Sequence, residues 1–150
     1  MDQQAAQDVE FESMLLGRHL GLLSRRSGGR LDRSAYTLLN RIRIEGSMSI
    51  GELSEAFGLD ASTLNRQTAA MMRAGLAERI ADPDGGIARK FQITPEGERL
   101  LDEEREANVK ALSRVLRDWT SGDVAEFASF LKRFNTDIER LDGHPWPRPQ

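Results

Sequence analysis

The chain contains no cysteine and no long apolar run. The absence of cysteine excludes disulfides, thiolate metal ligands and regulation by thiol oxidation. Nowhere do the roughly 18 consecutive apolar residues that suggest a membrane-spanning helix occur. The segment Met1–Asp8 has two acids and neither a basic nor an apolar block, so it does not resemble a signal peptide. We therefore expect a cytoplasmic protein that does not bind a membrane.

Groups that commonly carry catalysis are also scarce. The only histidines are His19 and His144, which lie 125 positions apart. Gly85-Gly86 follows a predicted strand, but neither a helix nor a lysine follows it as a phosphate-binding loop requires. Without a nucleophile beside a base or a cluster of metal ligands, we expect no enzymatic activity, no metal and no cofactor.

Positive charge is in deficit overall but is unevenly distributed. The formal net charge is −3, which argues mildly against nucleic-acid binding. However, residues 18–43 contain seven arginines and a single acid, whereas residues 96–106 contain six acids and two arginines. Different surfaces are therefore expected to face different partners.

The middle of the chain carries the signals of two short helices joined by a turn. Ser49 and Glu52 match an S-x-x-E capping box, which predicts a helix from residue 50 that ends at Gly58. Asp60 is placed to cap a second helix, predicted over Ala61–Ala74.

This second helix has two different faces at 100° per residue. One face is mainly apolar and consists of Leu64, Thr68, Met71 and Met72. The opposite face is short, polar and basic, which suits a recognition helix in a major groove, although an ordinary solvated face is the alternative. The predicted DNA-binding residues of the helix are Ser62, Thr63, Asn65, Arg66, Gln67 and Arg73.

Two alternating segments follow, Leu76–Ala81 and Arg89–Thr94, with the turn residues Asp82–Gly86 between them. They predict a β-hairpin. Helix, turn, helix and hairpin in this order predict a winged helix-turn-helix over residues 31–94, in a mainly α fold with a small β-hairpin wing (α+β).

The chain resembles MarR-type transcriptional regulators over most of its length. The order and spacing of several short motifs carry the resemblance: Leu31–Leu39, Ile50–Phe57, Ser62–Arg66, Gly75-Leu76, Asp82-Pro83-Asp84 and Ile93–Gly97. The resemblance implies a homodimeric DNA-binding regulator, most often a repressor. The alternative is a winged-helix protein-interaction module, but such a module is expected to expose apolar anchors where this chain has polar and basic residues.

Apolar faces predict further helices at both ends. The first is predicted over Val9–Leu23, a second over Leu31–Ile44, a long one over Pro95–Trp119, and a last one from Ser121 to about Leu141. The apolar stripe of the last helix requires a partner, so residues 9–26 and 95–142 are predicted to form a homodimer, as MarR-type proteins do. The three prolines within residues 143–150 predict a loose tail.

The wing departs from the pattern of the family. Family members commonly carry an Asp-x-Arg pattern whose arginine enters the minor groove, whereas the tip here is Gly85, Gly86 and Ile87. The nearest cations are Arg89 and Lys90 on the returning strand. We expect them to attract phosphates rather than to read the groove, with Arg89 the better placed and the arginines of residues 25–43 as the alternative phosphate contacts.

The resemblance also implies a small aromatic or phenolic effector between the dimer arms and the winged domain. The candidate ligand-binding residues are Arg18, His19 and Tyr36. The alternatives are that His19 packs in the dimer interface and that Tyr36 packs against the recognition helix.

Overall fold

The computed structural model describes residues 1–26 and 31–149, with the side chains of residues 24–26 left out. The described residues form six helices and one small antiparallel sheet. The helices are α1 (Gln3–Arg26), α2 (Arg33–Glu45), α3 (Ile50–Phe57), α4 (Ala61–Arg73), α5 (Pro95–Val115) and α6 (Ser121–Asp142), and the strands are β1 (Met48–Ser49), β2 (Ala77–Ile80) and β3 (Lys90–Ile93). The predicted mainly α fold with a small β wing is confirmed.

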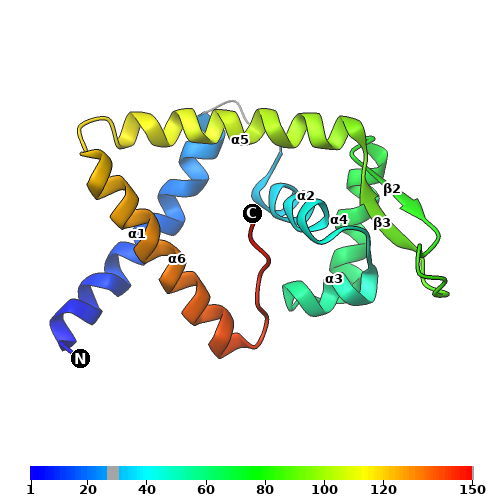
Figure 1. Ribbon diagram of the computed structural model, residues 1–150, viewed down its shortest axis with the longest axis horizontal. Coiled ribbons are helices and arrows are strands. Elements are labelled where there is room, and N and C mark those ends of the chain that lie inside the picture. The colour runs from blue at the N-terminus through cyan, green and yellow to red at the C-terminus, as the bar shows by residue number, and fades with distance from the viewer. Residues whose placement is uncertain (27–30, 150) are drawn as a thin grey trace.

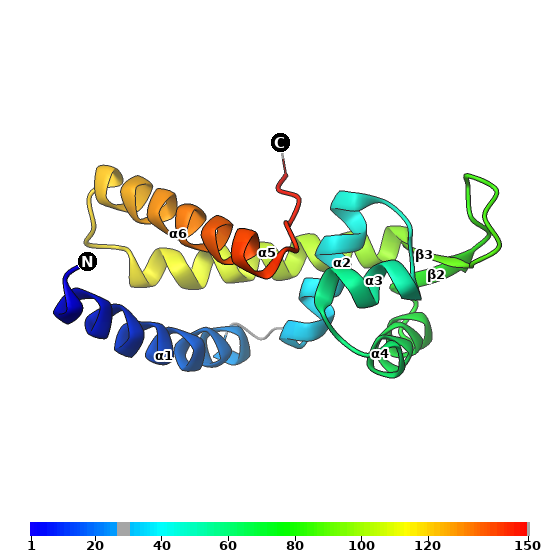
Figure 2. The same cartoon turned by 90° about the horizontal axis from the view of Figure 1, so that it is seen from below.

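Helix α5 runs along the length of the molecule and joins its two parts (Figure 1). At one end lie α2, α3, α4 and the sheet, which we call the winged-helix unit, and at the other lie α1 and α6, which we call the arm (Figures 1 and 2). No helix within the described residues is long and apolar enough to cross a membrane.

The predicted caps of the short helices are partly confirmed. The Ser49 hydroxyl accepts from the backbone N–H of Glu52 at 3.1 Å, and the Glu52 carboxylate accepts from the backbone N–H of Ser49 at 3.2 Å. Gly58 ends α3 in the left-handed conformation, with φ of 63°. The prediction for Asp60 was wrong in one respect, because its backbone precedes α4 as expected but its side chain makes no capping hydrogen bond.

The sheet contains a strand that periodicity does not predict. Strand β3 lies between β1 and β2, and Met48 of β1 pairs with Phe91 of β3. A strand as short as β1 has too few residues for an alternating pattern, so only its partner reveals it. Strands β2 and β3 are also shorter than predicted, since residues 81–89 form the connection between them.

Helix α2 lies between two clusters of buried apolar residues. One cluster lies beneath α3, α4 and the sheet and contains Leu38, Ile42, Met48, Leu53, Leu64 and Phe91. The other joins α2 to α5 and contains Leu31, Ala35, Leu39, Leu76, Leu100 and Leu101. Met71 of α4 packs against both. Helix α4 is therefore fixed to α5 through the core.

The arm differs from the winged-helix unit in its burial. Large apolar side chains of α1 and α6 are exposed, among them Phe11, Met14, Phe127, Phe130, Phe134 and Ile138, and none of the described residues of α6 is buried. Helix α1 begins earlier than predicted, and α5 ends four residues before Trp119. Thr120 then caps α6 by accepting from the backbone N–H of Asp123 at 3.1 Å.

The prediction of a loose tail was wrong. Residues 143–149 leave α6 without further helix, as the prolines require, but Trp146 packs against Phe57 of α3, with ring centroids 5.2 Å apart. Arg148 forms an ion pair with Glu139 at 2.6 Å. Proline restricts only the backbone, so the sequence pattern could not reveal these side-chain contacts.

Gly97→Ala is expected to destabilise the protein by about 1–3 kcal/mol, because a methyl group must displace packed backbone. A Cβ at Gly97 would lie 2.1 Å from the carbonyl oxygen of Leu76 and 2.7 Å from Cγ1 of Ile93. Thermal unfolding measures the effect. The matched control is Gly122→Ala in the first turn of α6, where the nearest atom lies 3.9 Å away. An equal loss in both variants would contradict the role of this close approach.

Candidate nucleic-acid interface

Helix α4 lies at the periphery of the winged-helix unit, beside the hairpin (Figure 2). Its inner face is fixed by Leu64, which is fully buried, and by Thr68, whose hydroxyl donates to the carbonyl oxygen of Leu64 at 2.8 Å. This confirms the predicted inner face. Of the six predicted DNA-binding residues, Ser62, Asn65, Arg66 and Arg73 are exposed, while Thr63 and Gln67 are half-buried.

Arg66 is available for contacts beyond the protein. Its Nη2 donates to the hydroxyl of Thr63 at a long distance of 3.4 Å. Among the described residues, no carboxylate forms an ion pair with Arg66 or Arg73. A guanidinium that is exposed and unpaired can form the bidentate contact that guanine offers in the major groove without first losing an internal ion pair.

Lys90 has a different environment from the one predicted. Its ammonium lies 3.1 Å from Glu52 and 3.7 Å from Asp82, and its side chain is only 15% exposed. The hydrogen bond to Glu52 raises the pKa of Lys90. Burial opposes the charged form of Glu52, but hydrogen bonds from the Ser49 backbone and from Lys90 outweigh it and lower the pKa of Glu52. Lys90 therefore holds the base of the wing to α3.

Arg89 near the tip of the wing is exposed, as is Arg79 on β2, and Ile87 near the tip is fully exposed. Two of the three arginines of α2 offer little as the alternative phosphate contacts, whereas the third, Arg33, is exposed. Arg41 is buried, and Arg43 forms an ion pair with Asp102 at 2.6 Å. The burial of Arg41 and the ion pair of Arg43 both result from tertiary packing. The number of arginines in the sequence therefore overstated the positive charge that is free to contact DNA. The side chains of residues 25, 26 and 30 lie outside the described part of the chain.

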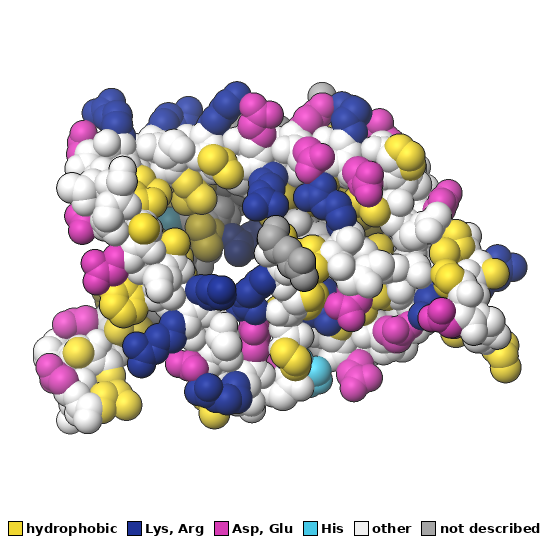
Figure 3. Space-filling model, in the orientation of Figure 1, with side chains coloured by type: hydrophobic (Ala, Val, Ile, Leu, Met, Phe, Trp, Pro, Cys, Tyr) yellow, Lys and Arg dark blue, Asp and Glu magenta, His cyan; other side chains and the backbone are white. Residues whose placement is uncertain are grey.

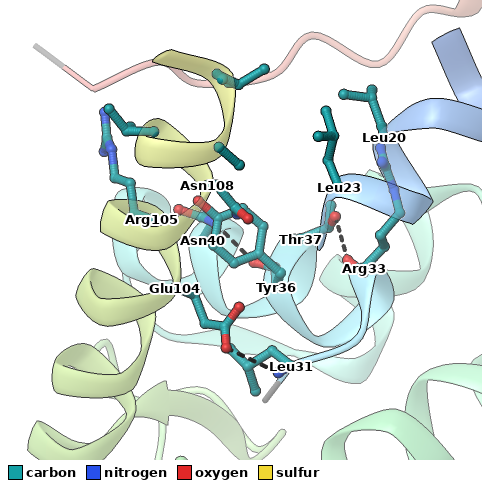
Figure 4. A pocket seen from close by; sticks show the side chains of 13 residues that line it. Leu20, Leu23, Leu31, Arg33, Tyr36, Thr37, Asn40, Glu104, Arg105 and Asn108 are labelled. Atoms are coloured by element: carbon teal, nitrogen blue, oxygen red, sulfur yellow. Dashed lines mark hydrogen bonds between the residues drawn. The ribbon is translucent and has the colours of Figure 1, made fainter. Parts of the chain in front are cut away.

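The three candidate effector residues do not come together. His19 lines a groove of about 630 Å³ between α1 and α6. Tyr36 lines a separate cavity of about 470 Å³ between α1, α2 and α5 (Figure 4). Arg18 is exposed and lines neither. Tyr36 also packs against the core cluster that joins α2 to α5.

Several residues of this second cavity were missed by the sequence analysis. Tyr36 and Asn40 of α2 face Asn108 of α5, with Arg33 and Arg105 on opposite sides and Glu104 near Leu31 (Figure 4). The side chain of Glu104 is buried and accepts from the backbone N–H of Leu31 at 3.3 Å. Arg105 lies in the acidic first half of α5, so no pattern in the sequence distinguishes it.

Comparison with known proteins identifies the family. Residues 31–86 match the model of the MarR family. The HTH-type transcriptional regulator YxaD of Bacillus subtilis is 32% identical over 136 residues, which cover 89% of this chain and 95% of the relative. The chain belongs to the MarR family. It is thus a MarR-family transcriptional regulator, in agreement with the resemblance seen in its motifs.

Solved structures of MarR-family proteins share the fold. A MarR-family protein from Bacillus stearothermophilus superposes with a TM-score of 0.80 at 21% identity, covering 92% of this chain and 98% of the other. The PcaV transcriptional regulator of Streptomyces coelicolor, solved in complex with its natural ligand, has a TM-score of 0.64 at 22% identity and covers 82% of this chain and 88% of its own.

Arg89→Ala is expected to weaken binding to all DNA sequences alike and to reduce the log–log salt slope by about two for a dimer, since each protomer loses one phosphate contact. A salt titration on operator and random duplexes measures both. The matched control is Lys110→Ala on α5, which removes an exposed charge far along the chain from the wing. Identical slopes for the wild type, Arg89→Ala and Lys90→Ala would mean that the wing does not touch DNA.

Proposed function

We propose that this MarR-family regulator is a homodimeric, sequence-specific DNA-binding protein that represses transcription from a pseudo-palindromic operator in the cytoplasm. The observation that carries the proposal is the outer face of α4. That face is polar and basic, Arg66 and Arg73 on it are exposed, and Leu64 and Thr68 hold the helix rigidly from behind. Such a helix on a rigid support suits base-edge contacts in a major groove.

The arm supports the homodimeric part of the proposal. The groove between α1 and α6 is lined mainly by apolar side chains, including Val9, Leu16, Phe127, Phe130 and Phe134. A second copy of the same chain would cover this apolar surface, which water otherwise contacts. Two-fold symmetry of the dimer would then place two recognition helices about one helical turn of DNA apart, which is why the operator is expected to be pseudo-palindromic.

The interaction-module alternative is less well supported. A protein-binding face is expected to present aromatic or other apolar anchors. The exposed side chains of α4 at positions 62, 65, 66 and 73 are serine, asparagine and two arginines. This composition favours phosphates and base edges over an apolar partner.

Arg66→Ala is expected to cost about 1–3 kcal/mol per half-site and to relax the preference for one base, because the substitution removes a base-edge contact. Fluorescence anisotropy with the operator and with single-base variants measures both effects. Arg73→Ala, at the last residue of α4, is the comparison variant and should weaken all sequences uniformly. Equal weakening of operator and random DNA by Arg66→Ala would contradict the base-reading role.

We further propose that a small aromatic carboxylate or phenol releases the protein from DNA by binding in the cavity of Tyr36. Leu20 and Leu23 supply apolar walls, and Arg33 and Arg105 supply cations on opposite sides (Figure 4). Basic side chains also surround the hollow between the arm and the winged-helix unit in Figure 3. An apolar cavity with a few polar groups fits a small aromatic acid.

Benzoate, 4-hydroxybenzoate and phenol are the probes for this site. We expect at least one of them to raise the melting temperature and to lower operator affinity, because a ligand that binds the folded state stabilises it. Arg105→Gln should remove the response to the carboxylates, whereas Arg18→Gln, at the exposed arginine outside the cavity, should retain it. No shift and no release across the panel would favour a regulator without such an effector.

A further inference from the structure

The C-terminal tail, residues 143–149, crosses from the end of α6 to the winged-helix unit (Figure 1). Gly143 ends α6 in the left-handed conformation, with φ of 78°. Its N–H and that of His144 donate to the carbonyl oxygen of Glu139 at 2.9 and 3.2 Å. The chain therefore turns sharply at Gly143, and the prolines on both sides of Trp146 keep it from continuing as helix.

Trp146 contacts two different helices of the winged-helix unit. Its ring meets Phe57 of α3 edge to face, at 5.2 Å between centroids and an interplanar angle of 85°. The guanidinium of Arg41 in α2 lies 4.7 Å from the centroid of the Trp146 ring. Both arrangements are favourable geometries for aromatic and cation–π contacts.

The contact with Arg41 has a specific electrostatic reason. Arg41 is only 8% exposed, and its Nε and Nη1 atoms have no hydrogen-bond partner among the described residues. The carboxylate of Glu45 lies 3.7 Å from Nε. A buried guanidinium with so few hydrogen bonds needs other compensation, which the face of the Trp146 ring supplies.

The far end of the tail is attached to α6. Both terminal nitrogens of Arg148 donate to the carboxylate of Glu139, at 2.9 and 2.6 Å, and Nη1 also donates to the carbonyl oxygen of Trp146 at 2.8 Å. The hydrogen bond from Arg148 lowers the pKa of Glu139. The tail is thus a closed loop on α6 whose tryptophan lies against α2 and α3.

We propose that this tail is a strap that fixes the orientation of the winged-helix unit relative to the arm, and that Trp146 and Arg148 are positioning residues for DNA recognition. The inference rests on the proposed dimeric DNA binding. Helix α5 runs through both parts, and the end of α1 lies beside α2 and α5. Among the described residues none of α6 is buried, so the strap is the attachment that holds the end of α6 to the winged-helix unit.

A second attachment matters because the two recognition helices must enter grooves about one helical turn apart. A winged-helix unit that moves relative to α6 as α5 bends has to be ordered on binding, whereas one that the tail also holds to α6 is already oriented. The strap should therefore govern the spacing of half-sites that the dimer accepts, while the side chains of α4 govern the bases within each half-site.

The test uses full-length Trp146→Ala and Arg148→Gln, with Arg140→Gln as the matched control. Arg140 lies on α6 beside Glu139, is exposed, and pairs with Asp137 rather than with the tail. Loss of two straps per dimer is expected to weaken operator binding by about tenfold. Two extra base pairs between the half-sites should lower the operator affinity of the strap variants less than that of the wild type. Single-base changes within a half-site should lower the affinity of the strap variants and of the wild type equally. Thermal melting and sedimentation check folding and dimerisation.

An unchanged spacing preference in both strap variants would overturn the proposal, as would an equal change in Arg140→Gln. Because the chain has no cysteine, the double substitution Ala61→Cys and Ser129→Cys allows one spin label in the winged-helix unit and one in the arm. The labelled protein is mixed with an excess of unlabelled protein, so that the distance is measured within one protomer. The distance distribution without DNA should broaden in the strap variants. If the wild type bound no DNA, the proposed function would fail, and this distance would still decide whether the strap exists.

Discussion

The packing of α2 between two apolar clusters is the constraint on which the rest of the structure depends. Leu38 and Leu39 are both fully buried, one in the cluster beneath the recognition helix and the other in the cluster against α5. Truncation of a buried leucine to alanine costs about 2–5 kcal/mol. Since α2 contacts both sides, it transmits the position of α5 to α4, and the recognition helix cannot shift without disturbing the core.

Positive charge in this protein has several separate uses. Arg66, Arg73 and Arg89 are exposed, and they form the proposed DNA contacts. Lys90 and Arg43 are bound by carboxylates of neighbouring elements and serve the fold. Arg41 is buried beneath a tryptophan. A chain with a formal net charge of −3 can present a basic DNA-binding face in this way because its acids pair with some cations and leave others free.

The two ends of the molecule obey different physical requirements. The winged-helix unit buries its apolar residues within one chain, whereas the arm exposes several phenylalanines. The proposed dimer would cover the exposed apolar side chains of the arm, and the proposed strap would limit how the winged-helix unit moves relative to the arm. In this arrangement a ligand between the arm and the winged-helix unit would bias the orientation of α4, because the cavity of Tyr36 is lined by both α1 and α5.

Local rules of helix and turn formation were enough to determine much of this protein from its sequence. The capping box at Ser49, the glycine at position 58 and the two faces of α4 follow from contacts within a few residues. These features identified the winged helix-turn-helix and its family. The pairing of Lys90 with Glu52, the two-residue strand β1, the separation of His19 from Tyr36 and the docking of Trp146 were decided by tertiary structure alone. Each joins groups whose distance in space is set by how the elements pack, and no local pattern encodes that distance.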